Sequence, residues 1–400
     1  MWYCTKRNDI MEVATKQQSI VNKLYVICMA ITLPLHVFNM GGGEGLKPFH
    51  IPAAIACVLS FFILKKNKRL YKYVILFLMS ALISSILSYA SSAYSIWLNT
   101  FIILTSCIGL AYVDYKQVLK YTFFLVPIDV IVLFYHSIVE PQYRYQGFYS
   151  DPNYLCTTLI VFIFLLLLVY SNAKKIITKV VIIGTLVLTY ALIFLTLSRT
   201  GLICSLLILL LASVDAVKKH FFKFIIAAIV GILALQHYAT TFLDNQWELM
   251  YERVFEANDN VEYAGSHRFQ LSLQNIRFIL DHPQYIPFGL GGGTTIGVNA
   301  SEVPGLAKYR KSPIGDHNTW TSTFSEQGLI CFILFAIIIF KTFKSVKGKK
   351  SGTNRYLLIG VFLSIFLFSF SVSQKTYLPF WWVIFFLNNS SLTKIEYSSK

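Results

Sequence analysis

Charged residues are scarce in this sequence of 400 residues. They make up 14% of the chain, whereas hydrophobic residues make up 56%. A soluble protein carries about 25% charged residues, because polar side chains have to cover its surface. The deficit therefore excludes an arrangement of two or three soluble domains. The sequence predicts instead an all-α polytopic membrane protein, in which each spanning helix needs about 20 mostly apolar residues.

Acidic residues are scarcer still. The chain has 19 Asp and Glu against 35 Lys and Arg, which gives a formal net charge of +16. In a soluble protein this excess would suggest a nucleic-acid partner. Here the basic residues stand in short runs between apolar segments, as they do in cytoplasmic loops under the positive-inside rule. We therefore expect membrane lipids around the chain and no nucleic acid.

The sequence also lacks a cysteine framework and any metal-binding motif. Its seven cysteines lie in apolar segments, at their ends or in the first few residues, so no disulfide framework is indicated. The polar loops contain neither Asp-x-Asp nor a cluster of His, Cys and carboxylates at metal-ligand spacing. The glycines between 289 and 297 follow no predicted strand, which favours a flexible or closely packed backbone over a dinucleotide site. We expect no metal and no cofactor.

Twelve apolar runs can be placed along the chain. They lie at about 24–40, 49–64, 73–90, 94–113, 118–139, 154–170, 180–198, 200–214, 221–238, 322–343, 356–372 and 377–389. With the amino terminus in the cytoplasm, the inner loops hold 25 Lys and Arg and the outer loops hold 10. This bias predicts twelve transmembrane helices with both termini in the cytoplasm.

One outer segment, 239–321, is far longer than the others, and a loop of this length is seldom a passive connector. Apolar residues three and four apart predict a helix over 266–280 within it, ended by Asp281-His282-Pro283. The chain then divides into three parts: transmembrane helices 1–9 in residues 1–238, a large outer loop in residues 239–321, and transmembrane helices 10–12 with a cytoplasmic tail in residues 322–400.

Arg199 is the only charge between two apolar runs, in Leu197-Ser198-Arg199-Thr200-Gly201. An arginine at membrane depth costs at least about 2.5–3.5 kcal/mol, so it usually faces protein or water and has a partner. The alternative is an arginine that reaches the outer headgroups, which the positive-inside bias disfavours. We favour a functional role for Arg199.

Two further arginines are weaker candidates. Arg144 shares a short outer loop with Asp151-Pro152-Asn153, a sequence that is equally typical of a turn at the start of a helix and of a binding site. Arg268 lies on the flank of the predicted loop helix, where an exposed surface arginine is the simpler alternative.

His317 and Asn318 lie where the long loop returns to the membrane. Gly328 follows inside the next apolar run, and Glu326 is an acidic residue at the outer end of that run. A single loop histidine is more often a surface or core residue, and two other histidines of the same loop have no stronger claim. His317 becomes a candidate through its surroundings.

Together these features resemble the O-antigen polymerase/ligase superfamily, bacterial inner-membrane glycosyltransferases that use lipid-diphosphate-linked sugars. The architecture is similar over nearly the whole chain, including a large periplasmic loop late in the sequence. His317-Asn318, nine residues and Gly328 resemble the family's His–(Asn/Ser/Gln)–nine–Gly signature, although Cys331 departs from the small or hydroxyl residue often found three places later. Arg199 is similar to the family's membrane-edge arginine, and Arg268 to its loop-helix arginine.

The resemblance implies transfer of a glycan from a polyprenyl-diphosphate-linked oligosaccharide to an acceptor hydroxyl, without a metal and with inversion. His317 is then the catalytic residue that accepts the hydroxyl proton, and Arg199 and Arg268 bind the diphosphate. Supporting candidates are Arg144, Asp151, Asn153, Asn318 and Glu326. Either Glu326 or Asp316 would orient the imidazole.

The acceptor stays open at this point. A polymerase would use another lipid-linked glycan, whereas a ligase would use a lipid A core or a protein. A different class, a flippase or transporter of lipid-linked oligosaccharides, would move the substrate without chemistry. Such proteins usually have pseudo-symmetric halves, whereas this chain has one long loop and few charges within its apolar runs, Asp129 being the main exception. We therefore favour an enzyme of the inner membrane that acts on the periplasmic face.

Overall fold

The computed structural model describes residues 2–38, 47–63, 69–214, 268–294, 302–309, 317–349, 353–389 and 391–392. Within these residues all regular structure is helical, as expected. The α-helices are α1 (Trp2–Leu35), α2 (His50–Ile63), α3 (Arg69–Ile86), α4 (Ala93–Ile108), α5 (Tyr115–Val139), α6 (Pro152–Asn172), α7 (Ile176–Leu195), α8 (Arg199–Ala212), α12 (Arg268–Asp281), α13 (Leu306–Tyr309), α14 (Thr319–Lys347), α15 (Thr353–Phe368) and α16 (Leu378–Leu387). Short 3₁₀ turns are η1 (His36–Phe38), η3 (Gly109–Ala111) and η4 (Pro283–Tyr285).

Helices occupy eleven of the twelve predicted apolar runs, and the remaining run, 221–238, lies outside the described residues. Six of the described helices are long and apolar enough to cross a membrane, and five further apolar helices are shorter. The chain is therefore a helical membrane protein. The total of twelve spans, the orientation of the termini and the three-part division of the chain stay predictions.

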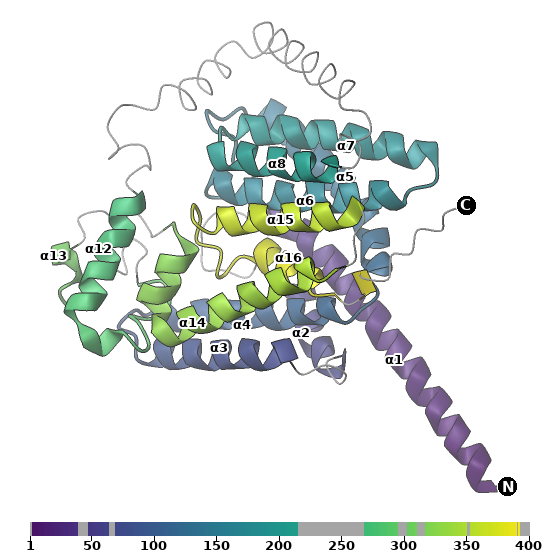
Figure 1. Cartoon of the computed structure of the whole chain (residues 1–400), viewed down its shortest axis with the longest axis horizontal. Coiled ribbons are helices and arrows are strands. Elements are labelled where there is room, and N and C mark those ends of the chain that lie inside the picture. Colours follow the sequence, from purple (N-terminus) through teal and green to yellow (C-terminus); the bar gives the residue numbers. More distant parts are fainter. Residues whose placement is uncertain are drawn as a thin grey trace, which may run out of the picture.

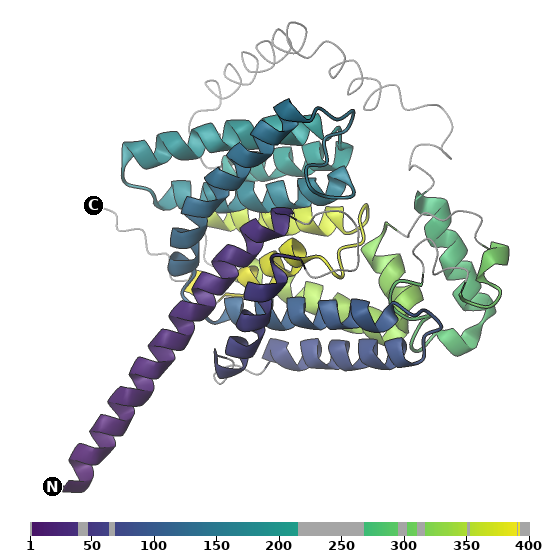
Figure 2. The same ribbon diagram turned by 180° about the vertical axis from the view of Figure 1, so that it is seen from behind.

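Two of the last helices, α15 and α16, lie between two groups of earlier ones. Figure 1 shows α5 to α8 on one side of α15 and α16, and α2 to α4 on the other. The packing agrees with this view, since α15 contacts α8 and α6, α16 contacts α4, and α14 contacts α3. From behind, α1 runs across the bundle beside α2 and α5 (Figure 2).

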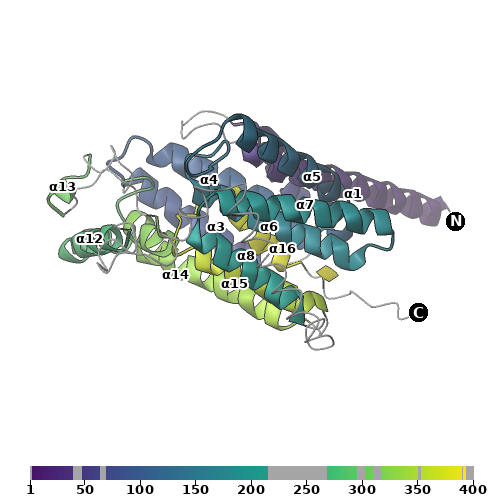
Figure 3. The same cartoon turned by 90° about the horizontal axis from the view of Figure 1, so that it is seen from above.

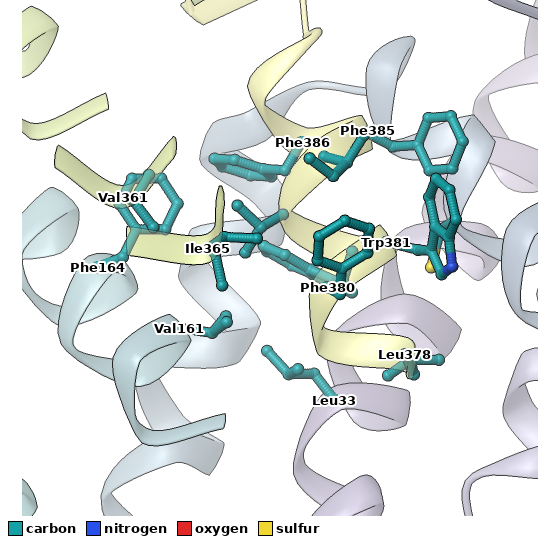
Figure 4. Packing of buried hydrophobic residues seen from close by; sticks show 14 of the residues in the cluster. Leu33, Val161, Phe164, Val361, Ile365, Leu378, Phe380, Trp381, Phe385 and Phe386 are labelled. Carbon is teal, nitrogen blue, oxygen red and sulfur yellow. The ribbon is translucent and has the colours of Figure 1, made fainter. Parts of the chain in front are cut away.

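The core of the bundle is centred on α16. All ten of its residues are buried, and so are most residues of α6. Figure 4 shows aromatic side chains of α16, of which Phe386 packs against Phe164 of α6, while Trp381 lies on the other side of the helix. A helix that is apolar all round is buried in a larger assembly. In contrast, α5 and α7 expose many large apolar side chains, as helices that face lipid do.

A small lobe lies at one end of the bundle, beyond the start of α14 (Figures 1 and 3). It contains α12, which is the helix expected over 266–280, and α13. The lobe has its own apolar cluster of Phe278, Ile279, Leu290, Val303 and Leu306. We refer to this end of the molecule as the α12 end; the start of α1 lies at the opposite end.

Candidate functional site

The helices that begin at the α12 end include α6, α8 and α14 (Figure 1). Each of these three begins with a polar residue whose side chain accepts a hydrogen bond from the backbone of the first turn. These residues are Asp151 for α6, Ser198 for α8 and Asn318 for α14. The amino end of a helix carries partial positive charge and unpaired N–H groups, so this arrangement favours anions at the α12 end.

Arg199 is the first residue of α8 and follows a tight junction with α7. Leu197, just before the cap residue, is the only residue other than glycine with a positive φ in the described part of the chain, at 51°. Arg144 lies against the same junction, because its Nε donates to the carbonyl oxygen of Thr196 at 3.4 Å. The fold thus brings Arg144 beside the turn that begins with Thr196 and ends at Arg199.

Asp151 and Asn153 connect this junction to α6. The Oδ1 atom of Asp151 accepts hydrogen bonds from both the backbone N and the Nδ2 of Asn153, each at 2.7 Å. The Oδ1 atom of Asn153 in turn accepts a hydrogen bond from the Ser198 hydroxyl at 2.7 Å. Asp-Pro-Asn therefore forms the start of α6, which is one of the two interpretations of this sequence. Its Asn153 also binds Ser198, the residue that precedes Arg199.

A second set of hydrogen bonds joins α6 to the start of α14. Gln374, in the segment between α15 and α16, donates from Nε2 to the Thr157 hydroxyl of α6 at 3.1 Å. Its backbone N donates to the Thr319 hydroxyl at 2.9 Å, and Thr319 stands two residues after His317. All three residues are fully buried. The Thr157 hydroxyl also donates to the Asn153 carbonyl oxygen at 3.1 Å, so the junction of Arg199 and the start of α14 belong to one continuous polar network.

His317 is half-buried and directly precedes the cap residue of α14. The helix is also tied to α12, because the Thr321 hydroxyl donates to the Ser272 hydroxyl at 3.1 Å. Arg268 is the first residue of α12, but its side chain lies outside the described part of the structure, as does Asp316. The helix that follows His317 and the helix that begins at Arg268 are therefore in direct contact.

Gly328 interrupts α14 with a φ of 82° and a ψ of 176°. Beyond it, the amides of Leu329 and Ile330 donate to the carbonyl oxygens of Ile286 and Pro287, at 2.8 and 3.4 Å. In return, the carbonyl oxygens of Ser325 and Glu326 accept from the amides of Leu290 and Gly291, at 2.9 and 2.7 Å. The segment that follows α12 is therefore inserted into the hydrogen-bonding pattern of α14.

Glycine is needed at two points of this insertion. A Cβ atom at Gly328 would collide with the Pro287 carbonyl oxygen, and one at Gly289 would collide with the backbone of Glu326. Both glycines also have positive φ, which costs other residues free energy. The described part of the glycine run, residues 289–293, is thus closely packed backbone, which is one of the two alternatives that the sequence left open.

The family comparison identifies this region. Residues 184–336 match the family model described as O-antigen ligase, from within α7 to within α14. The match over this segment supports the O-antigen polymerase/ligase superfamily, which the sequence resembles. No curated protein matches the chain. The matched segment contains Arg199, Arg268, His317 and Gly328, so the O-antigen ligase domain includes the helix starts described above except that of α6. A role in polysaccharide polymerisation or ligation follows, with a glycosyltransferase-like activity.

Two polar residues of the site were missed by the sequence reasoning. Gln374 and Lys375 lie outside the O-antigen ligase match, between α15 and α16. Lys375 forms a salt bridge with Glu326, and both side chains are buried. The sequence gave one indication for Lys375, since only four basic residues lie in the short loops that are predicted to be outside. Gln374 gave no signal, because its partners lie more than 50 residues away in the sequence.

Metal ligation in the O-antigen ligase domain was not expected. Among the residues that the structure describes, no three His, Cys, Asp or Glu side chains are grouped closely enough to hold an ion. Metal independence itself stays a prediction, because the long loop is only partly described.

Proposed function

We propose that the protein transfers a glycan from a polyprenyl-diphosphate-linked oligosaccharide to an acceptor hydroxyl, as a polysaccharide polymerase or ligase of the bacterial inner membrane. The α12 end is then the periplasmic face. The observation that supports this best is the position of Arg199 at the start of α8, directly after the turn that Arg144 contacts, at the end where α6 and α14 also begin.

The diphosphate is proposed to bind at the α12 end through Arg199, Arg268 and Arg144. Arginine suits this ligand because its planar guanidinium forms two parallel hydrogen bonds with phosphate oxygens. Negative charge grows on the diphosphate as the sugar leaves, and fixed positive charge stabilises that change. The amino ends of α6, α8 and α14 add partial positive charge without a metal. The buried network around Ser198 and Asn153 keeps the start of α8 in place.

His317 is proposed as the general base. In the reaction, the acceptor oxygen forms a bond with the anomeric carbon and its proton passes to the imidazole. The bond between the anomeric carbon and the phosphate oxygen breaks, and its electron pair leaves with the polyprenyl diphosphate. A neutral histidine suits this step near neutral pH. A single in-line displacement inverts the anomeric configuration.

The acceptor decides between the two family activities. A polymerase extends one lipid-linked glycan with another, whereas a ligase delivers the glycan to a lipid A core or a protein. We place polymerase first, because no part of the sequence suggests a dedicated acceptor-binding feature. The chemistry proposed for Arg199 and His317 is the same in both cases.

The test is a transfer assay with the purified protein in liposomes. The donor is a polyprenyl-diphosphate oligosaccharide with a fluorescent lipid end, supplied with unlabelled donor or with lipid A core as acceptor. Longer labelled lipid-linked products indicate a polymerase, and release of polyprenyl diphosphate with glycosylated core indicates a ligase. Arg199→Ala serves as the control. Movement of the labelled lipid across the bilayer with no new glycosidic bond would contradict the proposal in favour of a flippase.

A further inference from the structure

A buried salt bridge lies next to the break in α14. Lys375 Nζ contacts Glu326 Oε2, and the two residues are exposed to only 3% and 1%. Removing two charges from water is costly, and an apolar pair is often as stable. A pair in this position therefore calls for an explanation other than stability.

Each partner also binds a backbone group. These two contacts fix the direction of the pair, that is, which position carries the acidic residue and which the basic one. Glu326 Oε2 accepts a hydrogen bond from the Gly293 amide at 2.7 Å. Lys375 Nζ donates to the Ser322 carbonyl oxygen at 3.2 Å. A hydrogen-bond acceptor is thus required where the Gly293 N–H group points, and a donor where the Ser322 carbonyl oxygen points.

The pair joins three segments that each lead to the candidate site. Glu326 and Ser322 belong to the first turns of α14, which follow His317. Gly293 belongs to the segment that continues from α12, the helix that begins at Arg268. Lys375 belongs to the segment between α15 and α16, whose Gln374 binds α6 and the start of α14.

We infer that Lys375 and Glu326 are positioning residues for the transfer reaction. Their salt bridge holds the segment of Gln374 and the segment of Gly293 against the first turns of α14, and so sets where His317 stands relative to the arginine-bearing helices α8 and α12. Neither side chain touches the substrate. This inference rests on the proposed function, and it goes beyond it by assigning Lys375.

The first test measures kcat and KM for the donor in the liposome assay. Lys375→Met is expected to lower kcat by about 10- to 100-fold, because a displacement of about 1 Å in a catalytic group has effects of this size. The KM for the donor stays nearly unchanged. The matched control is Lys308→Met, which removes an exposed lysine from the α12 end and leaves both constants unchanged.

Two double variants then test the direction of the pair. Adding Glu326→Gln to Lys375→Met removes the buried carboxylate that has lost its partner, and glutamine can still accept the Gly293 amide. This double variant recovers part of kcat, and it keeps the test informative if Lys375→Met alone folds poorly. The exchange Glu326→Lys with Lys375→Glu restores opposite charges but opposes the two backbone groups, so it recovers no activity.

Three results would overturn the inference. Full turnover in both Lys375→Met and the neutral double variant would show that the pair does not position the site. A raised KM with unchanged kcat in Lys375→Met would mean that Lys375 binds the donor directly. Full activity in the charge exchange would mean that the direction of the pair is irrelevant. If wild-type protein forms no product while its fold is intact, the proposed function fails instead.

Discussion

At the scale of single residues, His317 has the most specific expected effect. His317→Ala should lower turnover by about 10²- to 10⁴-fold, the usual contribution of a positioned general base. Binding of the donor should be nearly unchanged, because the histidine acts on the acceptor hydroxyl. Transfer rates and donor binding in the same liposomes measure the two effects. Wild-type turnover in His317→Ala would make His317 an ordinary residue at the start of α14.

Substitution of Arg199 is expected to have a different effect from substitution of His317. Arg199→Ala should weaken donor binding and lower turnover together, because contacts with the diphosphate act before and during the reaction. Arg199→Lys should recover only part of the activity, since lysine keeps the charge but loses the paired hydrogen bonds. Titration with a lipid diphosphate that lacks the sugar separates binding from chemistry. Donor binding that is unchanged in Arg199→Ala would contradict this role.

The sequence identified those residues whose chemistry is unusual for their surroundings. Arg199 stood out as a charge between two apolar runs, and Glu326 as an acid at the edge of one. The sequence did not identify Gln374, because a buried amide is recognised as part of a site only through its hydrogen-bond partners. Those partners, Thr157 and Thr319, are brought together by the packing of α6, α14 and the segment before α16. Motifs of closely spaced residues carry no information on contacts between residues that lie far apart in the sequence.

At the scale of elements, the break in α14 has a direct test. Gly328→Ala should abolish most of the activity and lower the yield of folded protein. Its Cβ would collide with Pro287, and a residue with a side chain disfavours a φ of 82°. Folded yield by size-exclusion chromatography and turnover per folded molecule are the measurements.

Gly184→Ala is the matched control for that change. Gly184 lies within α7, and a Cβ atom added there meets no other atom within 4 Å. Alanine also favours helix over glycine, so yield and turnover should equal those of the wild type or exceed them. Equal behaviour of the two variants would contradict the structural role of Gly328.

The helices themselves were largely predictable, whereas the insertion into α14 was not. Long apolar runs at membrane length lead to helices because backbone groups in lipid have to be paired within the segment. The run at 322–343 gave no sign that the backbone of 286–291 supplies part of this pairing. Gly328 was noticed only as part of a motif. The reason for glycine appears when the two segments lie side by side.

At the scale of the whole molecule, the orientation in the membrane is still to be tested. In a protein without native cysteines, Ser150→Cys and Ser171→Cys are suitable probes, since both side chains are exposed. An impermeant thiol reagent added to intact cells with a permeabilised outer membrane should label position 150 and not position 171. The opposite pattern would invert the orientation and place the α12 end in the cytoplasm.

Metal independence is likewise a property of the whole protein. Transfer by the reconstituted enzyme should continue in excess EDTA, because arginines and helix starts are proposed to balance the charge of the diphosphate. Product formation with and without the chelator is the measurement. Activity that is lost in EDTA and restored by Mg²⁺ or Mn²⁺ would contradict the proposed mechanism.

The shared hydrogen bonding of α14 also constrains how the protein is made. An isolated α14 that kept the break at Gly328 would leave the carbonyl groups of Ser325 and Glu326 and the amides of Leu329 and Ile330 without partners, and each such group costs several kcal/mol in hydrocarbon. The broken helix therefore needs the segment that supplies these partners. The segment that supplies the partners precedes α14 in the chain. The ribosome therefore delivers it first, and it is available when α14 enters the membrane. The order of the segments along the gene matches the order in which the membrane protein can be assembled.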